Sequence, residues 1–309
     1  MLTMTSVLPH GADAVRTAAE RLLEAAATGR PCAPVRDLIA PDDLEAAYAV
    51  QRRIVDDRIA RGARIVGRKI GLTSEAVQRQ LQVDRPDFGV LFADMAYADG
   101  DVVPYEAVLQ PRVEAEVAFV LGADLADGPL DYAQVHAAVD YAVAALEICG
   151  SRIADWDISF ADTVADNASA GAYVLGTVRQ RLDAFTPRDA AMEMRIGDEV
   201  VSTGSGAACL GDPVEAVAWL ARQARELGEP LRAGQVILSG ALGPMRPVGA
   251  GDAVMADIGR LGTVAVAFGP PAEPVGPVGS VEPVGSVEPA GSVESVGSVG
   301  SVGSVEEDA

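Results

Sequence analysis

Apolar residues recur at helical spacing in the first sixty residues of the chain. Residues 12–27 carry leucine and alanine three and four positions apart, and Gly29 follows the last of them. Residues 41–61 again place apolar side chains roughly on one face, and Gly62 follows that segment. This spacing predicts two N-terminal helices.

From residue 64 the pattern changes to short apolar and β-branched runs, which are typical of strands. Further helices are predicted at 131–142 and at 213–227, where Asp212 can cap the helix and Pro213 suits its first position. Strands and helices do not alternate regularly, so we predict an α+β fold with a rolled mixed sheet rather than a doubly wound one. The predicted strands are 64–70, 113–121, 143–148, 200–203, 236–238, 254–258 and 263–268.

The C-terminal segment differs in composition from the rest of the chain. Residues 269–309 repeat Val-Gly-Ser-Val with Glu and Pro, and they contain no aromatic, basic, Leu or Ile residue. Such a segment cannot bury enough apolar surface to offset the entropy of ordering it. We therefore expect an N-terminal helical segment at 1–62 packed on the body, a catalytic mixed-sheet domain at 63–268 and a disordered acidic tail at 269–309.

Charge and composition exclude several classes of protein. The formal net charge of −21 argues against nucleic acid as a partner, because no basic face can be assembled. No apolar run reaches the roughly 18 residues of a membrane span, and the N-terminus lacks the basic region of a signal peptide. The three cysteines, Cys32, Cys149 and Cys209, are far apart and make neither a disulfide framework nor a zinc knuckle. We expect a cytoplasmic protein without a membrane partner.

Histidine is too scarce for two common kinds of site. His10 and His136 are the only histidines, and His136 is more typical of a structural residue in a helix. A His-rich metal site and a Ser-His-Asp triad are both poorly supported. A metal in this protein would need oxygen ligands, which favours Mg²⁺ or Mn²⁺.

Lys69 is the only lysine, whereas the other basic residues are arginine. Lysine carries a compact ammonium that can lose its proton when desolvated, and arginine stays charged. A single lysine between Gly67 and Gly71 therefore indicates a catalytic residue, although a residual surface lysine is the ordinary alternative.

Three glutamates form a candidate metal site. The two-residue period of a strand places Glu114 and Glu116 on one face of the strand predicted at 113–121. Glu147 is the only acid within the apolar run 144–150, where a carboxylate is costly unless it is paired or bound to a cation. Carboxylates meeting on neighbouring strands would make an all-oxygen divalent site. The alternative is an exposed strand face with solvated acids.

Further polar positions are candidates for the catalytic or substrate-binding part of a site. Asp87 lies in a predicted loop at 84–89, where it is either a cap or an active-site acid. Ser169 lies in a polar segment at 159–170, which is more often a packed loop but can line a pocket. Gly240 follows a strand and would let a substrate carboxylate approach backbone N–H groups, and Arg68 beside Lys69 is a further substrate-binding candidate.

Several long stretches, taken together and in order, resemble the 2-keto-4-pentenoate hydratase family of the fumarylacetoacetate hydrolase superfamily. This resemblance implies a rolled sheet of the fumarylacetoacetate hydrolase C-terminal-domain type. It also implies addition of water to 2-hydroxypenta-2,4-dienoate, giving 4-hydroxy-2-oxopentanoate, in the meta-cleavage breakdown of aromatic compounds. The stretches are 67–95, 109–121, 145–171, 209–221 and 240–252.

The same resemblance implies residue roles and partners. Glu114, Glu116 and Glu147 match the family's metal ligands, Lys69 and Asp87 match its active-site lysine and aspartate, and Ser169 falls near its pocket. We expect Mg²⁺ or Mn²⁺, a 2-oxo acid substrate, a homo-oligomer and a possible complex with the downstream aldolase. Lys69 is expected to shuttle protons with a lowered pKa, and Asp87 to position or activate water.

Three alternatives stay open. The sister family of 2-oxo-hex-3-enedioate (4-oxalocrotonate) decarboxylases shares the metal and lysine motifs, although residues 151–169 look nearer to the hydratases. Lys69 could instead form a Schiff base in an aldolase. A non-catalytic partner subunit is the third alternative, and the retention of three glutamates argues against it.

Overall fold

The computed structural model describes residues 11–74, 78, 83 and 85–270. Apart from Gly269 and Pro270, the predicted acidic tail lies outside the described residues. The described residues all belong to one compact unit. None of the helices in the described part of the chain is long and apolar enough to cross a membrane.

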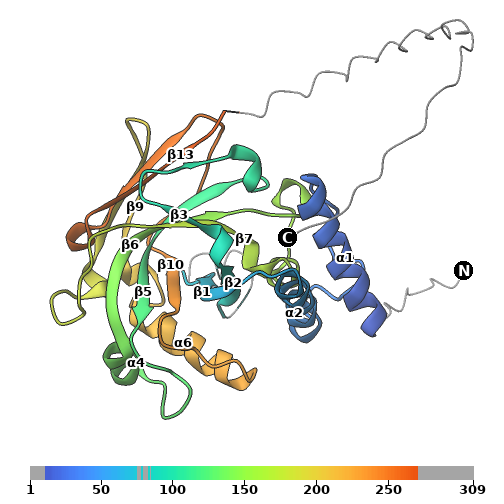
Figure 1. Cartoon of the computed structure of the whole chain (residues 1–309), viewed down its shortest axis with the longest axis horizontal. Helices are drawn as coiled ribbons and strands as arrows, with labels where there is room; N and C mark the ends of the chain where they lie inside the picture. Colours follow the sequence, from blue (N-terminus) through green and yellow to red (C-terminus); the bar gives the residue numbers. More distant parts are fainter. Residues whose placement is uncertain (1–10, 75–77, 79–82, 84, 271–309) are drawn as a thin grey trace, which may run out of the picture. The chain divides into compact units, whose positions relative to one another are not determined.

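The two N-terminal helices begin and end close to the predicted residues. Helix α1 spans Ala12–Thr28 and helix α2 spans Leu44–Ala60. Gly29 ends α1 in the left-handed conformation, and the Asp43 side chain accepts a hydrogen bond from the Ala46 N–H at the start of α2. Both helices contribute to a separate apolar cluster with helix α5, Phe160–Ala165. Figure 1 shows α1 and α2 side by side at one end of the larger sheet.

The larger sheet is mixed, as predicted. Its strands follow the order β2-β1-β10-β5-β6-β7-β3, and β11 also pairs with β5. Strands β1 and β10, and strands β3 and β7, are parallel, whereas the other pairs are antiparallel. The strands are β1 (Ile65–Gly71), β2 (Asp87–Phe92), β3 (Ala96–Ala98), β5 (Arg112–Leu121), β6 (Val139–Cys149), β7 (Ala170–Leu175), β10 (Val236–Ala241) and β11 (Arg246–Pro247).

A smaller sheet, α4 and α6 enclose the main core. The smaller sheet has the order β4-β13-β12-β8-β9, and α4 and α6 pack together beside the larger sheet (Figure 1). Asp212 caps α6 as predicted, with its side chain accepting from the Val214 N–H. The elements are α4 (Tyr132–Ala138), α6 (Pro213–Glu226), β4 (Val102–Val103), β8 (Ala191–Ile196), β9 (Glu199–Ser205), β12 (Ala253–Asp257) and β13 (Thr263–Phe268).

The structure corrects the sequence prediction in three places. The helix predicted at 131–142 ends at Ala138, because the following residues already belong to strand β6, which pairs with β5 over its whole length. Asp87 begins strand β2 rather than lying in a loop. The loop predicted at 159–170 contains α5, where Ser159 and Asp162 form a capping box.

Strand β5 has two different buried faces. Val113, Val117 and Phe119 alternate along it and enter the main core between the sheets. Glu114 and Glu116 occupy the other face and are also buried. A strand buried on both faces that carries acids on one of them needs a partner for those charges.

Candidate active site

Glu114 and Glu147 face each other across two neighbouring strands. They are direct partners in the antiparallel β5–β6 register, so their side chains leave the same face of the sheet. Glu147 is fully buried and Glu114 is 9% exposed. No described residue donates a hydrogen bond to either carboxylate oxygen of Glu147. Two buried carboxylates therefore converge, and that of Glu147 lacks a hydrogen-bond donor among the described residues.

Glu116 lies on the same face but one pair further along. Its partner on β6 is Ala145, and its Oε2 accepts a hydrogen bond of 2.7 Å from the Gly240 N–H on β10. Its Oε1 has no hydrogen-bond partner within the described residues. The Gly240 N–H, which the sequence suggested for a substrate carboxylate, is thus used by Glu116. Gly240 has a φ of +112°, and a Cβ there would overlap the Thr73 side chain.

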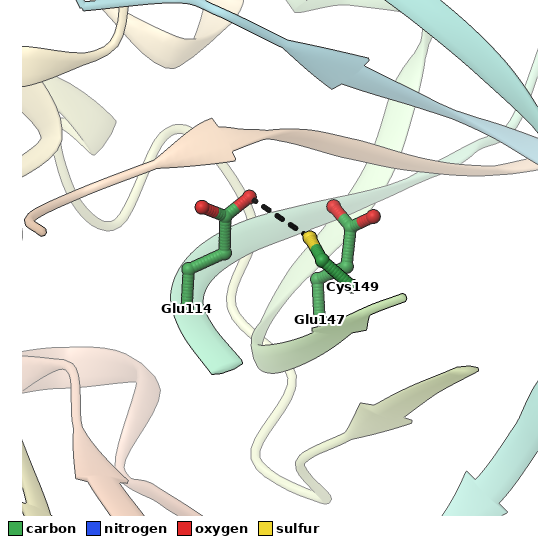
Figure 2. A group of neighbouring side chains, drawn as sticks. All are labelled: Glu114, Glu147 and Cys149. Atoms are coloured by element: carbon green, nitrogen blue, oxygen red, sulfur yellow. Dashed lines mark hydrogen bonds between the residues drawn. The ribbon is translucent and has the colours of Figure 1, made fainter. Parts of the chain in front are cut away.

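The residues that lie close enough to share a metal ion differ from the predicted three glutamates in one member. Glu114, Glu147 and Cys149 offer ligand atoms that all lie within 4.8 Å of one another, and Glu116 is not among them. Figure 2 shows the Cys149 sulfur directed toward the two carboxylates, with its contact of 3.8 Å to Glu114 Oε1. The sequence contained the signal, because Cys149 follows Glu147 by two residues on a strand and shares its face.

The Lys69 ammonium reaches this carboxylate group from strand β1. Its Nζ lies 3.1 Å from Glu147 Oε1 and donates a hydrogen bond of 3.0 Å to the Ala168 carbonyl. Strand β1 is three positions from β6 in the sheet order, which would separate them by about 14 Å in a flat sheet. The curl of the sheet therefore brings Lys69 to Glu147. The side chain is buried, so Lys69 is not a residual surface lysine.

Asp87 occupies the space beside Lys69 because Gly71 has no side chain. Gly71 and Asp87 are paired in the β1–β2 register, and a Cβ on Gly71 would overlap Asp87 Oδ1. Asp87 Oδ2 is 3.5 Å from the Thr163 hydroxyl, which is 3.2 Å from the Ser169 hydroxyl. Oδ1 has no hydrogen-bond partner among the residues described. Asp87, Lys69 and Ser169 thus lie together, linked by Thr163, which the sequence did not indicate.

Arg68 is placed on the other side of the sheet. Consecutive residues of a strand point to opposite faces, so Arg68 leaves β1 away from Lys69. Its guanidinium is buried and forms an ion pair of 2.9 Å with Glu229. The structure does not bring this predicted substrate-binding residue into the candidate site.

A short left-handed segment holds Ala168 in place. Asn167, Ala168 and Ser169 have φ values of 54°, 51° and 56°, a conformation that costs energy for residues other than glycine and asparagine. The Asn167 side chain pairs with both backbone groups of Val90, accepting at 2.8 Å and donating at 3.0 Å. Asn167 thereby replaces a neighbouring strand at the free edge of β2. The sequence indicated only that this segment could line a pocket.

Burial and mutual repulsion raise the pKa of the acids. Burial is the larger cause and the charge of Glu147 the second. Together they raise the pKa of Glu114 to about 7 and raise the pKa of Glu116 well above its usual range. Burial also raises the pKa of Asp87, although Lys69 opposes this effect. The same surroundings raise the pKa of the Cys149 thiol well above its usual range, burial first and Glu147 second. The acids are therefore costly to ionise without a compensating cation.

Lys69 does not have the lowered pKa that the sequence analysis expected. Burial by itself lowers its pKa, but the carboxylates of Glu147 and Asp87 outweigh burial, so the pKa lies well above its usual value. The group is an ammonium at neutral pH in this arrangement.

The carboxylates fit a divalent cation. Glu147 presents two buried oxygens without hydrogen bonds, Glu116 presents one, and the Glu114 carboxylate lies across the strand pair from Glu147. An orphaned buried carboxylate oxygen costs free energy that a cation would recover. Oxygen donors are the preferred ligands of Mg²⁺ and Mn²⁺.

Comparison with known proteins assigns this fold to one family. The family of fumarylacetoacetate (FAA) hydrolase C-terminal domains matches residues 59–268. The chain is 54% identical to the TodF product hydratase of Pseudomonas putida, over 82% of this chain and 95% of that protein. It is 51% identical to a 2-keto-4-pentenoate hydratase of Paraburkholderia xenovorans, over 81% of this chain and 93% of that protein.

Among solved structures, the chain is similar to 4-oxalocrotonate decarboxylase from Pseudomonas putida G7, complexed with magnesium and adipate. The TM-score is 0.81 and the sequence identity 32%, and the match covers 84% of this chain and 99% of the decarboxylase.

Proposed function

The chain belongs to the fumarylacetoacetate hydrolase family and, within it, to the 2-keto-4-pentenoate hydratases, and from this membership and the buried acid site we propose its reaction. It is a hydro-lyase that adds water to 2-hydroxypenta-2,4-dienoate to give 4-hydroxy-2-oxopentanoate in the meta-cleavage catabolism of aromatic compounds. The observation that carries the proposal is the group of buried carboxylates with free oxygens beside the only lysine of the chain.

In this proposal Glu114 and Glu147 hold a divalent cation, and Glu116 supplies a further oxygen. Gly240 keeps Glu116 in place by its backbone hydrogen bond. When bound, the cation would act as a Lewis acid toward the carboxylate and 2-oxo oxygens of the substrate. The similar decarboxylase was solved in complex with magnesium, which supports a divalent ion in proteins of this fold.

Lys69 contributes a fixed positive charge and a proton donor. Its raised pKa keeps it protonated, one N–H donates to the Ala168 carbonyl, and the ammonium forms an ion pair with Glu147. An ammonium has three N–H groups, so a further one can donate to an oxygen of the substrate. Lys69 thus stabilises the negative charge that develops on the 2-oxo oxygen, as a preorganised donor does in other active sites.

Asp87 is positioned to carry a proton. Its Oδ1 has no hydrogen-bond partner within the described structure, and burial raises the pKa of its carboxyl group. We assign to Asp87 the proton that the terminal carbon of the dienol takes up, and afterwards the activation of the water that adds to the enone. Thr163 and Ser169 keep the carboxyl group oriented.

The proposal includes four finer points. The cation is Mg²⁺ or Mn²⁺, the protein is a homo-oligomer, it acts in the cytoplasm, and it can associate with the aldolase that consumes its product. The oxygen-donor set supports the first point. The cytoplasmic location rests on the three scattered cysteines, which indicate a reducing compartment. The oligomer and the aldolase complex rest on the family resemblance, and size-exclusion chromatography with light scattering tests the oligomer.

A diode-array assay tests the reaction. The purified protein is mixed with 2-hydroxypenta-2,4-dienoate or with 2-oxo-hex-3-enedioate, with Mg²⁺ or with EDTA, and the product is identified by mass. We expect the dienol to gain one water in the presence of the metal and no reaction in EDTA. Loss of carbon dioxide from the hexenedioate, with the dienol unchanged, would support the decarboxylase instead.

Two further measurements distinguish the hydratase from an aldolase and from a non-catalytic subunit. Borohydride reduction with substrate would trap an imine if Lys69 acted as a Schiff-base nucleophile. Such a product in the intact mass spectrum would contradict the hydratase mechanism. Turnover by the isolated protein would exclude a non-catalytic subunit.

A further inference from the structure

The candidate metal site contains a thiol that an all-oxygen site does not need. Cys149 is buried, and its Sγ lies 3.8 Å from Glu114 Oε1. The sulfur and one oxygen from each of Glu114 and Glu147 lie within 4.8 Å of one another, so the three atoms could hold one metal ion. Figure 2 shows the sulfur on the same side of the strands as both carboxylates.

The surroundings of Cys149 favour a ligand rather than a packing role. Both oxygens of Glu147 lie in the same buried space without hydrogen bonds from described residues. The other cysteines are placed differently. Cys209 donates to the Ser239 carbonyl at 2.7 Å, and Cys32 is half-buried in a separate apolar cluster. Cys149 is therefore the cysteine whose sulfur lies against the two buried carboxylates.

We propose that Cys149 is a sulfur donor of the metal site, so that soft divalent ions such as Cd²⁺ and Zn²⁺ bind through Glu114, Glu147 and Cys149. Mg²⁺ and Mn²⁺ bind through the carboxylates alone, since they prefer oxygen. When the metal–sulfur bond forms, the thiol proton leaves to solvent, and no oxidant or reductant is needed. This inference rests on the proposed metal site and adds a determinant of its ion selectivity.

Cadmium absorption provides a test that does not depend on activity. One equivalent of Cd²⁺ is added to the metal-free full-length protein, and the sulfur-to-cadmium charge-transfer band is recorded in the ultraviolet. We expect the band in the wild type, in Cys32→Ser and in Cys209→Ser, and its loss in Cys149→Ser. A band that persists in Cys149→Ser, or that is lost in Cys209→Ser, would overturn the proposal.

Calorimetry separates this inference from the metal site itself. We expect Cys149→Ser to weaken Cd²⁺ binding by about tenfold or more, and to change Mn²⁺ binding by less than about twofold. Tight Cd²⁺ binding to the wild type without the charge-transfer band would leave the carboxylate site intact and refute the sulfur ligand. Failure of both ions to bind would refute the metal site and this inference together.

A direct measurement on the wild type covers the case in which Cys149→Ser fails to fold. X-ray absorption at the cadmium edge of the loaded protein should show one sulfur among oxygen neighbours. A shell containing oxygen or nitrogen alone would refute the proposal without any substitution.

Discussion

Asn167 is expected to stabilise the fold and to position Lys69 through the left-handed segment 167–169. Its amide pairs with both backbone groups of Val90, and the next carbonyl, that of Ala168, accepts the hydrogen bond from Lys69. Asn167→Ala removes both contacts to β2 and places alanine at a φ of 54°, which asparagine adopts more easily. The substitution therefore affects the backbone that holds the ammonium without touching the carboxylates.

The expected loss in the free energy of unfolding of Asn167→Ala has two contributions. Two backbone groups of Val90 lose their partners, at about 1–3 kcal/mol each when they stay buried and unsatisfied. Alanine in the left-handed conformation adds about 1–2 kcal/mol. Asn167 lines a groove between α1, α2 and β2, through which water can reach the freed groups, so we take the lower values. The expected loss is about 3–4 kcal/mol in the free energy of unfolding.

Urea unfolding of Asn167→Ala and Asn167→Gly separates the two contributions, because glycine tolerates positive φ. We expect glycine to be more stable than alanine by about 1–2 kcal/mol while lacking the same hydrogen bonds. Both variants should also lose kcat, because the Ala168 carbonyl shifts relative to Lys69. An alanine variant within about 1 kcal/mol of the wild type, at an unchanged m-value, would refute the reasoning.

Three further predictions concern the acid site. Glu147→Gln should abolish metal-dependent turnover and Mn²⁺ binding by calorimetry while the circular dichroism spectrum stays native, and normal Mn²⁺ affinity would contradict the ligand assignment. Lys69→Arg should lower kcat/KM by a factor of about 10²–10⁴, because a guanidinium is too large for the space beside Asp87. If the variant keeps more than about a tenth of the wild-type kcat/KM, arginine can replace Lys69 and only its charge matters. The metal-free protein should lose thermal stability as the pH rises from about 5 to 8, because the pKa of Glu114 is raised to about 7 in the folded state. The protonated carboxyl group of Glu114 favours the folded state below its unfolded pKa, and this contribution is lost as the pH rises through its folded pKa. This slope should be smaller in Glu114→Gln, and an equal slope would show that Glu114 is not the group responsible.

Periodicity was sufficient to place the glutamates on one face but not to fix their partners. The two-residue period puts Glu114 and Glu116 together, and the apolar run around Glu147 indicates a buried strand. The β5–β6 register decides which of these two glutamates lies opposite Glu147. This register is a property of the tertiary structure and cannot be read from the period of one strand. The structure pairs Glu147 with Glu114 and leaves Glu116 bonded to Gly240 on β10.

The approach of Lys69 and Asp87 to the glutamates could not be deduced from local sequence. It depends on the curl of the sheet across four strands and on the missing side chain of Gly71. Asp87 was expected in a loop because a short strand next to Arg85 and Pro86 gives a weak pattern. The resemblance to a known family identified both residues, whereas the geometry explains why they meet.

The raised pKa of Lys69 changes the explanation for why this position carries the only lysine of the sequence. A lysine that must lose its proton would need apolar surroundings, but here the charges of nearby acidic groups, that of Glu147 above all, outweigh the effect of burial. The ammonium instead has to fit between Glu147 Oε1 and the Ala168 carbonyl, at 3.1 and 3.0 Å. Arginine has the charge but not the compact head that this space requires. Size as well as charge therefore accounts for lysine at this one position. A bound divalent cation would neutralise the glutamates and would bring the pKa of Lys69 back toward its usual range.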